Sequence, residues 1–238
     1  MKAMIFAAGL GTRLKPWTDK HPKALALVNG KSLLQRNIEY LQLHGINQVI
    51  INVHHFADQI VAAVAMNNGW GSQIEISDET SEVLETGGGL KKAAWYFEQE
   101  QHFVLMNVDI LTDLNLTAMI QQHQQNQVLA TLAVTERNTS RYFLFNENNL
   151  LCGWKNVHTN EEKIVRQDVP LVAKAFSGVH VIDTAIFSLM QQKGKFSMVD
   201  VYLSVANTNF IQSFDHSGGK LLDVGKPESI AKAEQLFV

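Results

Sequence analysis

Cysteine is nearly absent from this 238-residue chain, and long apolar runs and an excess of basic residues are missing. The single cysteine, Cys152, excludes an intramolecular disulfide and a metal site made of several cysteines. It lies between Leu151 and Gly153 in a strand-like run, where we predict a small core side chain. The formal net charge is −3, so we expect no nucleic-acid partner.

The shortage of apolar runs also bears on location. Every such run is strand-sized, whereas a helix that spans a membrane needs ~20 apolar residues. The apolar N-terminus does not extend into a signal peptide, because Arg13 and Lys15 interrupt it too early. We therefore expect no membrane partner and a cytoplasmic location. The hydrophobic fraction of 46% is nevertheless sufficient for a substantial core.

The most informative segment is a loop of small residues that follows the apolar run 3–6. It reads Ala7-Ala8-Gly9-Leu10-Gly11-Thr12-Arg13. Glycines allow backbone N–H groups to surround an anion, because no Cβ keeps a phosphate oxygen away. Arg13 adds a planar, permanently charged fork suited to phosphate. We therefore expect this loop to bind the phosphates of a nucleotide.

Two familiar phosphate motifs are incomplete here. The P-loop pattern Gly-x-x-x-x-Gly-Lys-Ser/Thr is absent. The dinucleotide pattern Gly-x-Gly-x-x-Gly has Gly9 and Gly11 but Leu14 in the third place, and Pro16 interrupts the helix that should follow. A nicotinamide oxidoreductase is therefore a remote alternative, since Asn52 also stands where an acidic ribose ligand would follow the second strand.

Strand-like and helix-like segments alternate through the first half of the chain. This βαβα order predicts an α/β fold with a doubly wound sheet, in which ligands bind beyond the carboxyl ends of the strands. The predicted strands are 4–7, 48–53, 73–77, 103–106 and 128–134, and the predicted helices are 33–43, 57–66, 90–99 and 116–125.

The second half is less regular. Residues 141–145 and 150–155 predict a hairpin around 146–149, and Pro227 predicts the first turn of a final helix. With no repeat and no long linker, we expect one domain over residues 1–238. In it, we expect about 1–135 to bind the nucleotide and about 136–238 to form a second part. Further predicted elements are strands at 176–182, 210–214 and 220–223 and helices at 187–190 and 201–206.

Two aspartates follow predicted strands. Asp109 comes after the strand at 103–108, and Asp223 comes after Leu221-Leu222. Phosphoryl chemistry normally uses Mg²⁺ held by carboxylates, so both are candidate ligands, with capping of a turn as the alternative for each. Asp113 precedes a predicted helix, where an N-cap role is sufficient.

The stretch from Ala7 to Leu25 resembles the signature of the sugar-1-phosphate nucleotidyltransferases. That signature is Ala-Ala-Gly-x-Gly-Thr-Arg-Leu-x-Pro-x-Thr followed by Pro-Lys-x-Leu, and every fixed position is present. The resemblance implies a Rossmann-like, doubly wound mixed sheet of the nucleotide-diphospho-sugar transferase type. It implies catalytic roles for Arg13, Lys23 and Asp109. The implied nucleotide-binding residues are Ala7, Ala8, Gly9, Gly11, Thr12, Arg13, Lys23, Gly87 and Gly88.

The resemblance also assigns the metal. The family holds Mg²⁺ with an aspartate in an Asn/Gly-Gly-Asp pattern and another in Asp-Val/Ile-Gly-Thr/Lys-Pro, which correspond to Asp109 and Asp223. Val108 departs from the family's glycine and narrows the space near the ribose or sugar.

A second glycine segment, Leu84-Glu85-Thr86-Gly87-Gly88-Gly89, resembles the family segment that packs against the base and ribose. Gly87 and Gly88 are expected to let the backbone approach the ligand closely, just before a helix that begins at Leu90. The acidic residues around this segment predict a solvated loop. They are Asp78, Glu79, Glu82 and Glu85.

The resemblance assigns sugar-phosphate binding and the second metal ligand to the part at about 136–238, where its motifs are less complete. Phe176-Ser177-Gly178 resembles a family strand whose glycine lies against the sugar, and Asp200 occupies a segment that closes over the sugar in relatives. The family's Glu-Lys-Pro motif is missing, which leaves three lysines as alternatives for its cation. The expected sugar-phosphate ligands are Asn107, Gly178 and Asp200, and the alternative lysines are Lys155, Lys163 and Lys174.

The implied reaction joins a nucleoside triphosphate and a sugar 1-phosphate, giving a nucleotide sugar and pyrophosphate. The short chain and the run from Leu84 to Gly89 favour the muramate uridylyltransferase type, with UTP and N-acetylmuramic acid 1-phosphate as substrates. A mannose- or heptose-1-phosphate guanylyltransferase is the close alternative. A non-catalytic sensor of nucleotide sugars is the rival from a different class.

Overall fold

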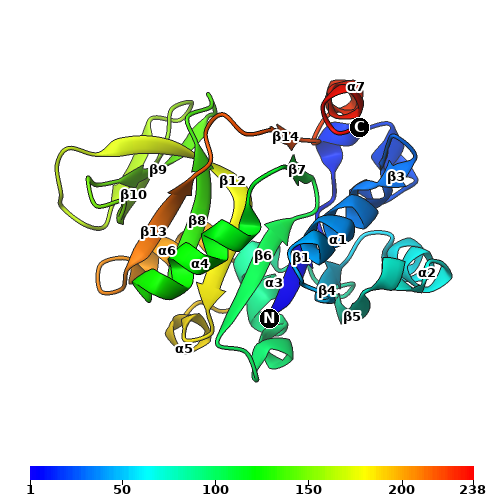
Figure 1. The fold of residues 1–238 in the computed structure, drawn as a ribbon, viewed down its shortest axis with the longest axis horizontal. Coiled ribbons are helices and arrows are strands. Elements are labelled where there is room, and N and C mark those ends of the chain that lie inside the picture. Colours follow the sequence, from blue (N-terminus) through cyan, green and yellow to red (C-terminus); the bar gives the residue numbers. More distant parts are fainter.

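The computed structural model describes all residues 1–238, and a ten-stranded mixed sheet forms its centre (Figure 1). The strands follow the order β11-β10-β9-β12-β6-β1-β4-β5, with β8 beside β12 and β13 beside β8. The parallel part carries the first half of the chain. It consists of β1 (Lys2–Phe6), β4 (Gln48–Val53), β5 (Gln73–Asp78) and β6 (His102–Asn107).

The second half of the chain extends this sheet with mostly antiparallel strands. Strand β12 pairs antiparallel with β6 and so joins the two parts in one continuous sheet. The predicted hairpin is confirmed as β9 and β10, and Cys152 is fully buried in it. These strands are β8 (Ala130–Thr135), β9 (Arg141–Phe145), β10 (Leu151–Asn156), β11 (Glu161–Ile164), β12 (Val172–Asp183) and β13 (Ile211–Asp215).

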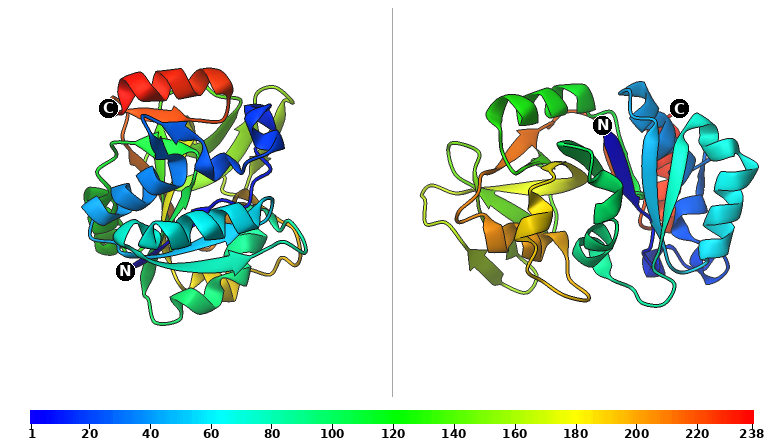
Figure 2. Two further views of the ribbon diagram at one scale, coloured as in Figure 1. Left: turned by 90° about the vertical axis from the view of Figure 1, so that its right-hand side faces the viewer. Right: turned by 90° about the horizontal axis from the view of Figure 1, so that it is seen from below.

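Helices cover both faces of the sheet (Figure 2), as a doubly wound fold requires. Strand β1 shows why: Ile5 packs into one core with α1 and α4, whereas Met4 and Phe6 pack into the opposite core with α3 and α6. Alternate residues of a strand point to opposite faces, so an uninterrupted apolar run belongs in a strand buried on both sides. The helices are α1 (Leu33–Leu43), α2 (Ala57–Met66), α3 (Glu85–Lys92), α4 (Leu116–Asn126), α5 (Ile186–Leu189), α6 (Met198–Val205) and α7 (Pro227–Leu236).

A small separate sheet ties the end of the chain to its middle. Strand β14 (Leu221–Asp223) pairs antiparallel with β7 (Ile110–Thr112), and Asp223 lies opposite Ile110. Helix α7 follows directly and begins at Pro227, as predicted. None of the helices combines the length and the apolarity needed to span a bilayer.

Two local predictions are wrong. The helix expected from Leu90 begins at Glu85, so all three glycines of the run lie inside α3. Glycine costs about 1 kcal/mol per residue in a helix interior relative to alanine, which is why the sequence pattern hides this start. Asp113 is not the cap of α4; the Asn115 side chain accepts the bond from Ala118 N, while Asp113 Oδ1 accepts from Lys220 N at 2.7 Å.

Candidate active site

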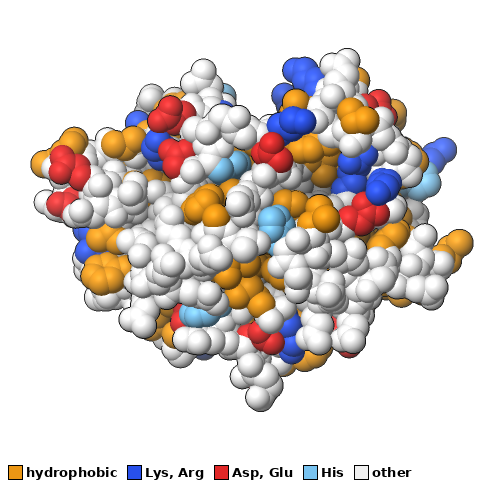
Figure 3. Space-filling view, viewed as in Figure 1, with side chains coloured by type: hydrophobic (Ala, Val, Ile, Leu, Met, Phe, Trp, Pro, Cys, Tyr) orange, Lys and Arg blue, Asp and Glu red, His pale blue; other side chains and the backbone are white.

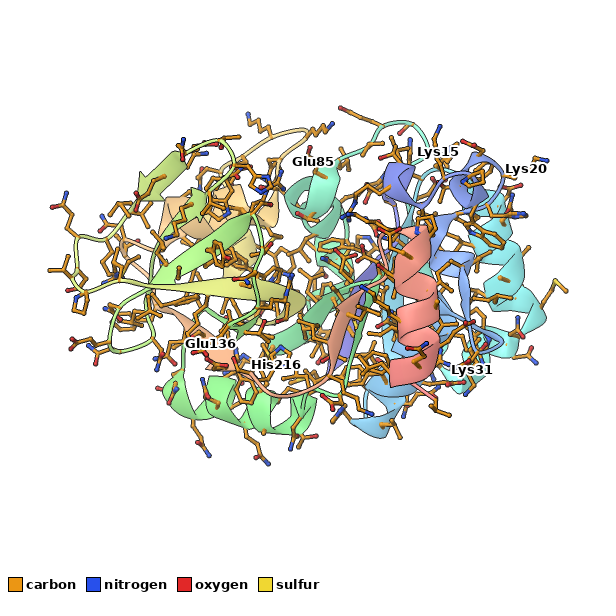
Figure 4. All side chains as sticks on the ribbon, turned by 90° about the horizontal axis from the view of Figure 1, so that it is seen from above. Lys15, Lys20, Lys31, Glu85, Glu136 and His216 are labelled. Carbon is orange, nitrogen blue, oxygen red and sulfur yellow. The ribbon has the colours of Figure 1, made fainter.

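A cavity of about 520 Å³ lies where β1, β4 and β6 end. Phe6, Asn52 and Asn107, at or next to the carboxyl ends of these strands, all line it. Figure 3 shows the upper edge of the molecule notched between the side that carries α7 and the side that carries β9 and β10. Figure 4 looks down on this edge and shows Glu85 on α3 and Lys15 in the loop after β1. Open α/β sheets bind their ligands beyond the carboxyl ends of the strands, and the cavity lies in that position.

The predicted phosphate loop forms one wall of this cavity. Gly11 has a φ of +62°, and a Cβ there would lie 2.9 Å from Thr18 Cγ2 and 3.0 Å from Lys23 Cβ. A side chain at this position is therefore both strained and too close to its neighbours. A Cβ at Gly9 would meet nothing within 4 Å, so its backbone is open to a ligand. The loop residues that line the cavity are Ala7, Ala8, Gly9, Gly11, Thr12 and Arg13.

Two ion pairs set the electrostatics of the cavity. Lys23 Nζ contacts Asp109 Oδ2, and both side chains are largely buried. Arg13 Nη2 lies 3.6 Å from Asp223 Oδ2 in a more exposed pair. Each predicted phosphate cation is thus held by one predicted metal carboxylate. Asp109, Lys23 and Arg13 line the cavity.

The two carboxylates come from segments that are 114 positions apart but lie next to one another. Val224 N donates to the backbone oxygen of Asp109 at 2.8 Å, and Asp223 pairs with Ile110 across β7 and β14. Asp223 Oδ1 is buried without a hydrogen-bond partner. A Cβ at Gly225 would lie 2.6 Å from that oxygen, so only glycine leaves the carboxylate its position.

These features fit a hard divalent cation. Asp223, with its unpartnered carboxylate oxygen, and Asp109 lie on neighbouring segments and offer the oxygen ligands that Mg²⁺ prefers, although only Asp109 lines the cavity. No group of three or more His, Cys, Asp or Glu side chains gathers at a possible metal site in the chain. Asp109 and Asp223 could therefore supply only part of an octahedral shell, and phosphate and water oxygens would complete it. This incomplete protein set is typical of Mg²⁺ bound together with phosphate substrates.

A buried relay, which the sequence did not reveal, holds the phosphate loop. Ala7 N donates to Asn52 Oδ1 at 2.7 Å, and Asn52 Nδ2 donates to Glu79 Oε1 at 2.8 Å. Leu84 N lies 3.4 Å from Glu79 Oε2. The prediction that Glu79 belongs to a solvated loop is wrong, since the residue is fully buried. Burial raises the pKa of its carboxyl above the ordinary value.

The relay connects the phosphate loop to the start of α3. Glu85 and Thr86 line the cavity, whereas Gly87 and Gly88 do not. The N–H groups of both glycines donate to Phe196 O, at 2.9 and 3.1 Å. A Cβ at Gly87 would lie 2.5 Å from the Phe196 side chain. Close packing against Phe196, and not contact with a ligand, therefore explains why this residue is glycine.

The predicted sugar ligands lie at different depths. Asn107 lines the cavity. Gly178, with a φ of +74°, does not line it but packs against Asn107, since a Cβ at Gly178 would lie 3.1 Å from Asn107 Nδ2. Asp200 caps α6 by accepting from Ser197 N and Ser197 Oγ, and Ser197 itself reaches the cavity. Among the cations of the second half, the structure brings Arg141 to the cavity and none of the three lysines proposed from the family motif.

Comparison with known proteins gives a consistent family and fold. The family model described as nucleotidyl transferase matches residues 2–237. The N-acetylmuramate alpha-1-phosphate uridylyltransferase of Caulobacter vibrioides is 41% identical over 109 residues, which cover 45% of each chain. The mannose-1-phosphate guanyltransferase of Aspergillus fumigatus is 24% identical over 242 residues, 100% of this chain and 64% of that protein. These matches thus span about half to two thirds of the curated relatives' own length.

The same fold is found among solved structures. The crystal structure of HddC from Yersinia pseudotuberculosis, complexed with GMP-PN, superposes with a TM-score of 0.80. It is 24% identical and covers 100% of this chain and 99% of that one. The predicted nucleotide-diphospho-sugar transferase fold is confirmed.

Proposed function

The chain belongs to the nucleotidyl transferase family, and we propose that it transfers a nucleotidyl group from a nucleoside triphosphate to a sugar 1-phosphate. An anionic oxygen of the sugar phosphate attacks the α-phosphorus in line. A new P–O bond forms, the bond from the α-phosphorus to the bridging oxygen breaks, and pyrophosphate leaves. The attacking oxygen is already charged, so no general base is needed.

The residues of the chain act through alignment and charge. Lys23 lies where it can contact the reacting phosphates, and Arg13 balances the charge of the departing pyrophosphate. Asp109 and Asp223 are suited to hold Mg²⁺, which supplies charge neutralisation at the phosphates when bound. The open backbone at Gly9 supports binding of the triphosphate along the loop.

One observation carries the proposal. Arg13 of the glycine loop is paired with Asp223, and Lys23, which lines the same cavity, is paired with Asp109; one oxygen of Asp223 has no partner. A carboxylate oxygen without a partner in the protein is available to a cation of the ligand complex. Because both expected metal aspartates and both expected phosphate cations are present, we favour catalysis over a non-catalytic sensor of nucleotide sugars.

We favour UTP and N-acetylmuramic acid 1-phosphate as substrates. The uridylyltransferase of Caulobacter vibrioides, at 41% identity, supports this choice over part of the chain. A mannose- or heptose-1-phosphate guanylyltransferase is the second candidate, because the Aspergillus fumigatus relative aligns with the whole chain and HddC is complexed with GMP-PN. Such soluble substrates agree with the cytoplasmic location expected from the sequence.

The test pairs each triphosphate with each sugar 1-phosphate. Purified protein with Mg²⁺ receives UTP, GTP, CTP or ATP together with N-acetylmuramic acid, mannose or heptose 1-phosphate, and pyrophosphate release is followed. We expect the highest kcat/KM for UTP with N-acetylmuramic acid 1-phosphate, and only background release from the Asp109→Asn variant. Triphosphate binding without pyrophosphate release for any pair would support the sensor instead.

A further inference from the structure

Three cationic side chains line the cavity, and only one of them is free. Lys23 is paired with Asp109, and Arg13 is paired with Asp223. The third, Arg141, is exposed, and its guanidinium takes part in none of the chain's ion pairs, hydrogen bonds or cation–π contacts. An arginine that faces a cavity without an acidic partner is available to an anion of the ligand.

The backbone around Arg141 is held by the second half of the chain. Arg141 is the first residue of β9 and lies opposite Asn156 of β10. Val157 N donates to Ser140 O at 2.9 Å, and Thr139 N donates to the Tyr142 hydroxyl at 2.9 Å. In Figure 1, β9 and β10 lie toward the left edge of the sheet, whereas the loop that follows β1 lies at the upper right, near α7. Strands β12 and β6 separate β9, which carries Arg141, from β1, which precedes the phosphate loop, and both Arg141 and the loop line the cavity.

The three lysines that could replace the missing family motif are engaged elsewhere. Lys174 Nζ contacts Glu136 at 2.8 Å and Asp215 at 2.7 Å, and these hydrogen bonds raise its pKa. Lys163 Nζ lies 3.2 Å from Glu161, and Lys155 Nζ lies over the ring of Tyr142. None of them reaches the cavity.

We propose that Arg141 binds the phosphate of the sugar 1-phosphate and orients it for attack. This inference rests on the proposed function and names the residue that holds its second substrate. The ligand is a phosphate monoester dianion, whose oxygens match the two parallel N–H donors of a guanidinium. The position suits the chemistry, because the attacking phosphate must approach the α-phosphorus from the side opposite the pyrophosphate, which lies toward Arg13.

The test compares Arg141→Gln and Arg141→Lys with the wild type in steady-state kinetics. Loss of a charge-assisted bidentate contact predicts a rise of about tenfold to a hundredfold in KM for the sugar 1-phosphate. The KM for the triphosphate and its Kd in the absence of sugar phosphate stay within about twofold. Arg141→Lys recovers part of the loss, since it restores charge without the fork. Lys163→Gln, which removes an exposed cation of the same side outside the cavity, serves as the control and keeps wild-type constants.

The outcomes separate this inference from the proposed function. A wild-type protein that forms no nucleotide sugar from any pair overturns both. An active wild type with an unchanged sugar-phosphate KM in Arg141→Gln overturns the role of Arg141 alone. A weaker Kd for the triphosphate in Arg141→Gln overturns it as well, because the guanidinium would then serve the nucleotide.

Discussion

Removal of the Asn52 side chain breaks the relay that holds the phosphate loop. In Asn52→Ala, the buried Ala7 N–H loses its acceptor, and Glu79 Oε1, inside a fully buried residue, loses its donor. Each buried polar group left without a partner costs about 1–3 kcal/mol, so the two together cost about 4 kcal/mol. For a domain of this size, we expect the melting temperature to fall by about 8–16 °C.

Thermal unfolding followed by circular dichroism measures the effect. Asn148→Ala is the matched control, because Asn148 is exposed and its side chain makes no hydrogen bond; its stability should stay within about 0.5 kcal/mol of the wild type. At a temperature where Asn52→Ala remains folded, calorimetric titration should also show weaker binding of the triphosphate, since the loop loses its anchor. Equal melting temperatures for the two variants would show that the relay does not hold the loop.

Two further predictions concern catalysis and acid stability. Lys23→Met should lower kcat by about a hundredfold or more, because the lysine stabilises charge that develops in the transition state. Thermal unfolding should still show a folded protein, and a wild-type kcat would remove Lys23 from the mechanism. Burial lowers the pKa of His123 to about 4 and that of His180 to about 3. Between pH 6.5 and 4, the unfolded chain therefore binds protons that the folded chain refuses, and the free energy of unfolding falls on acidification by up to about 1.4 kcal/mol per pH unit for each histidine. Urea unfolding at pH 7, 6 and 5 measures this slope, and His180→Gln should make it shallower; a slope equal to that of the wild type would contradict the assignment.

The regular elements could be predicted because their patterns are local. Helix α1 agrees residue for residue with the prediction, since Ser32 caps its start and Gly45, with a φ of +76°, follows its end. Strand β4 is equally clear as a β-branched run. The start of α3 could not be predicted, because a Cβ at Gly87 or Gly88 is excluded by Phe196 and Gly194, more than 100 positions away.

The site was predictable only where function leaves a mark in the sequence. Motif and position predict the phosphate loop, Asp109 and Asp223 as site residues. The structure brings the loop and Asp109 to one cavity, and the roles of these residues stay predictions. Glu79 was misread because acidic neighbours suggest solvent, and only the fold brings Asn52 beside it. The only sign of the buried relay in the sequence is Asn52, a polar residue near the end of the mostly apolar strand β4. Arg141 was missed because its approach to the cavity depends on how the β9–β10 hairpin joins the sheet.

The pairing of β14 with β7 has a consequence for the folding of the chain while it is being translated. Asp223 comes next to the segment that carries Asp109 only when residues 221–223 pair with β7. Val224 and Ala233 then pack in the same small apolar cluster as Leu14 and Leu33. A nascent chain that has assembled its parallel strands on the ribosome still lacks this carboxylate until residues beyond 220 emerge. If Asp223 holds Mg²⁺ as proposed, the metal site is completed only when β14 docks, and we expect a translation product that stops before residue 221 to be inactive.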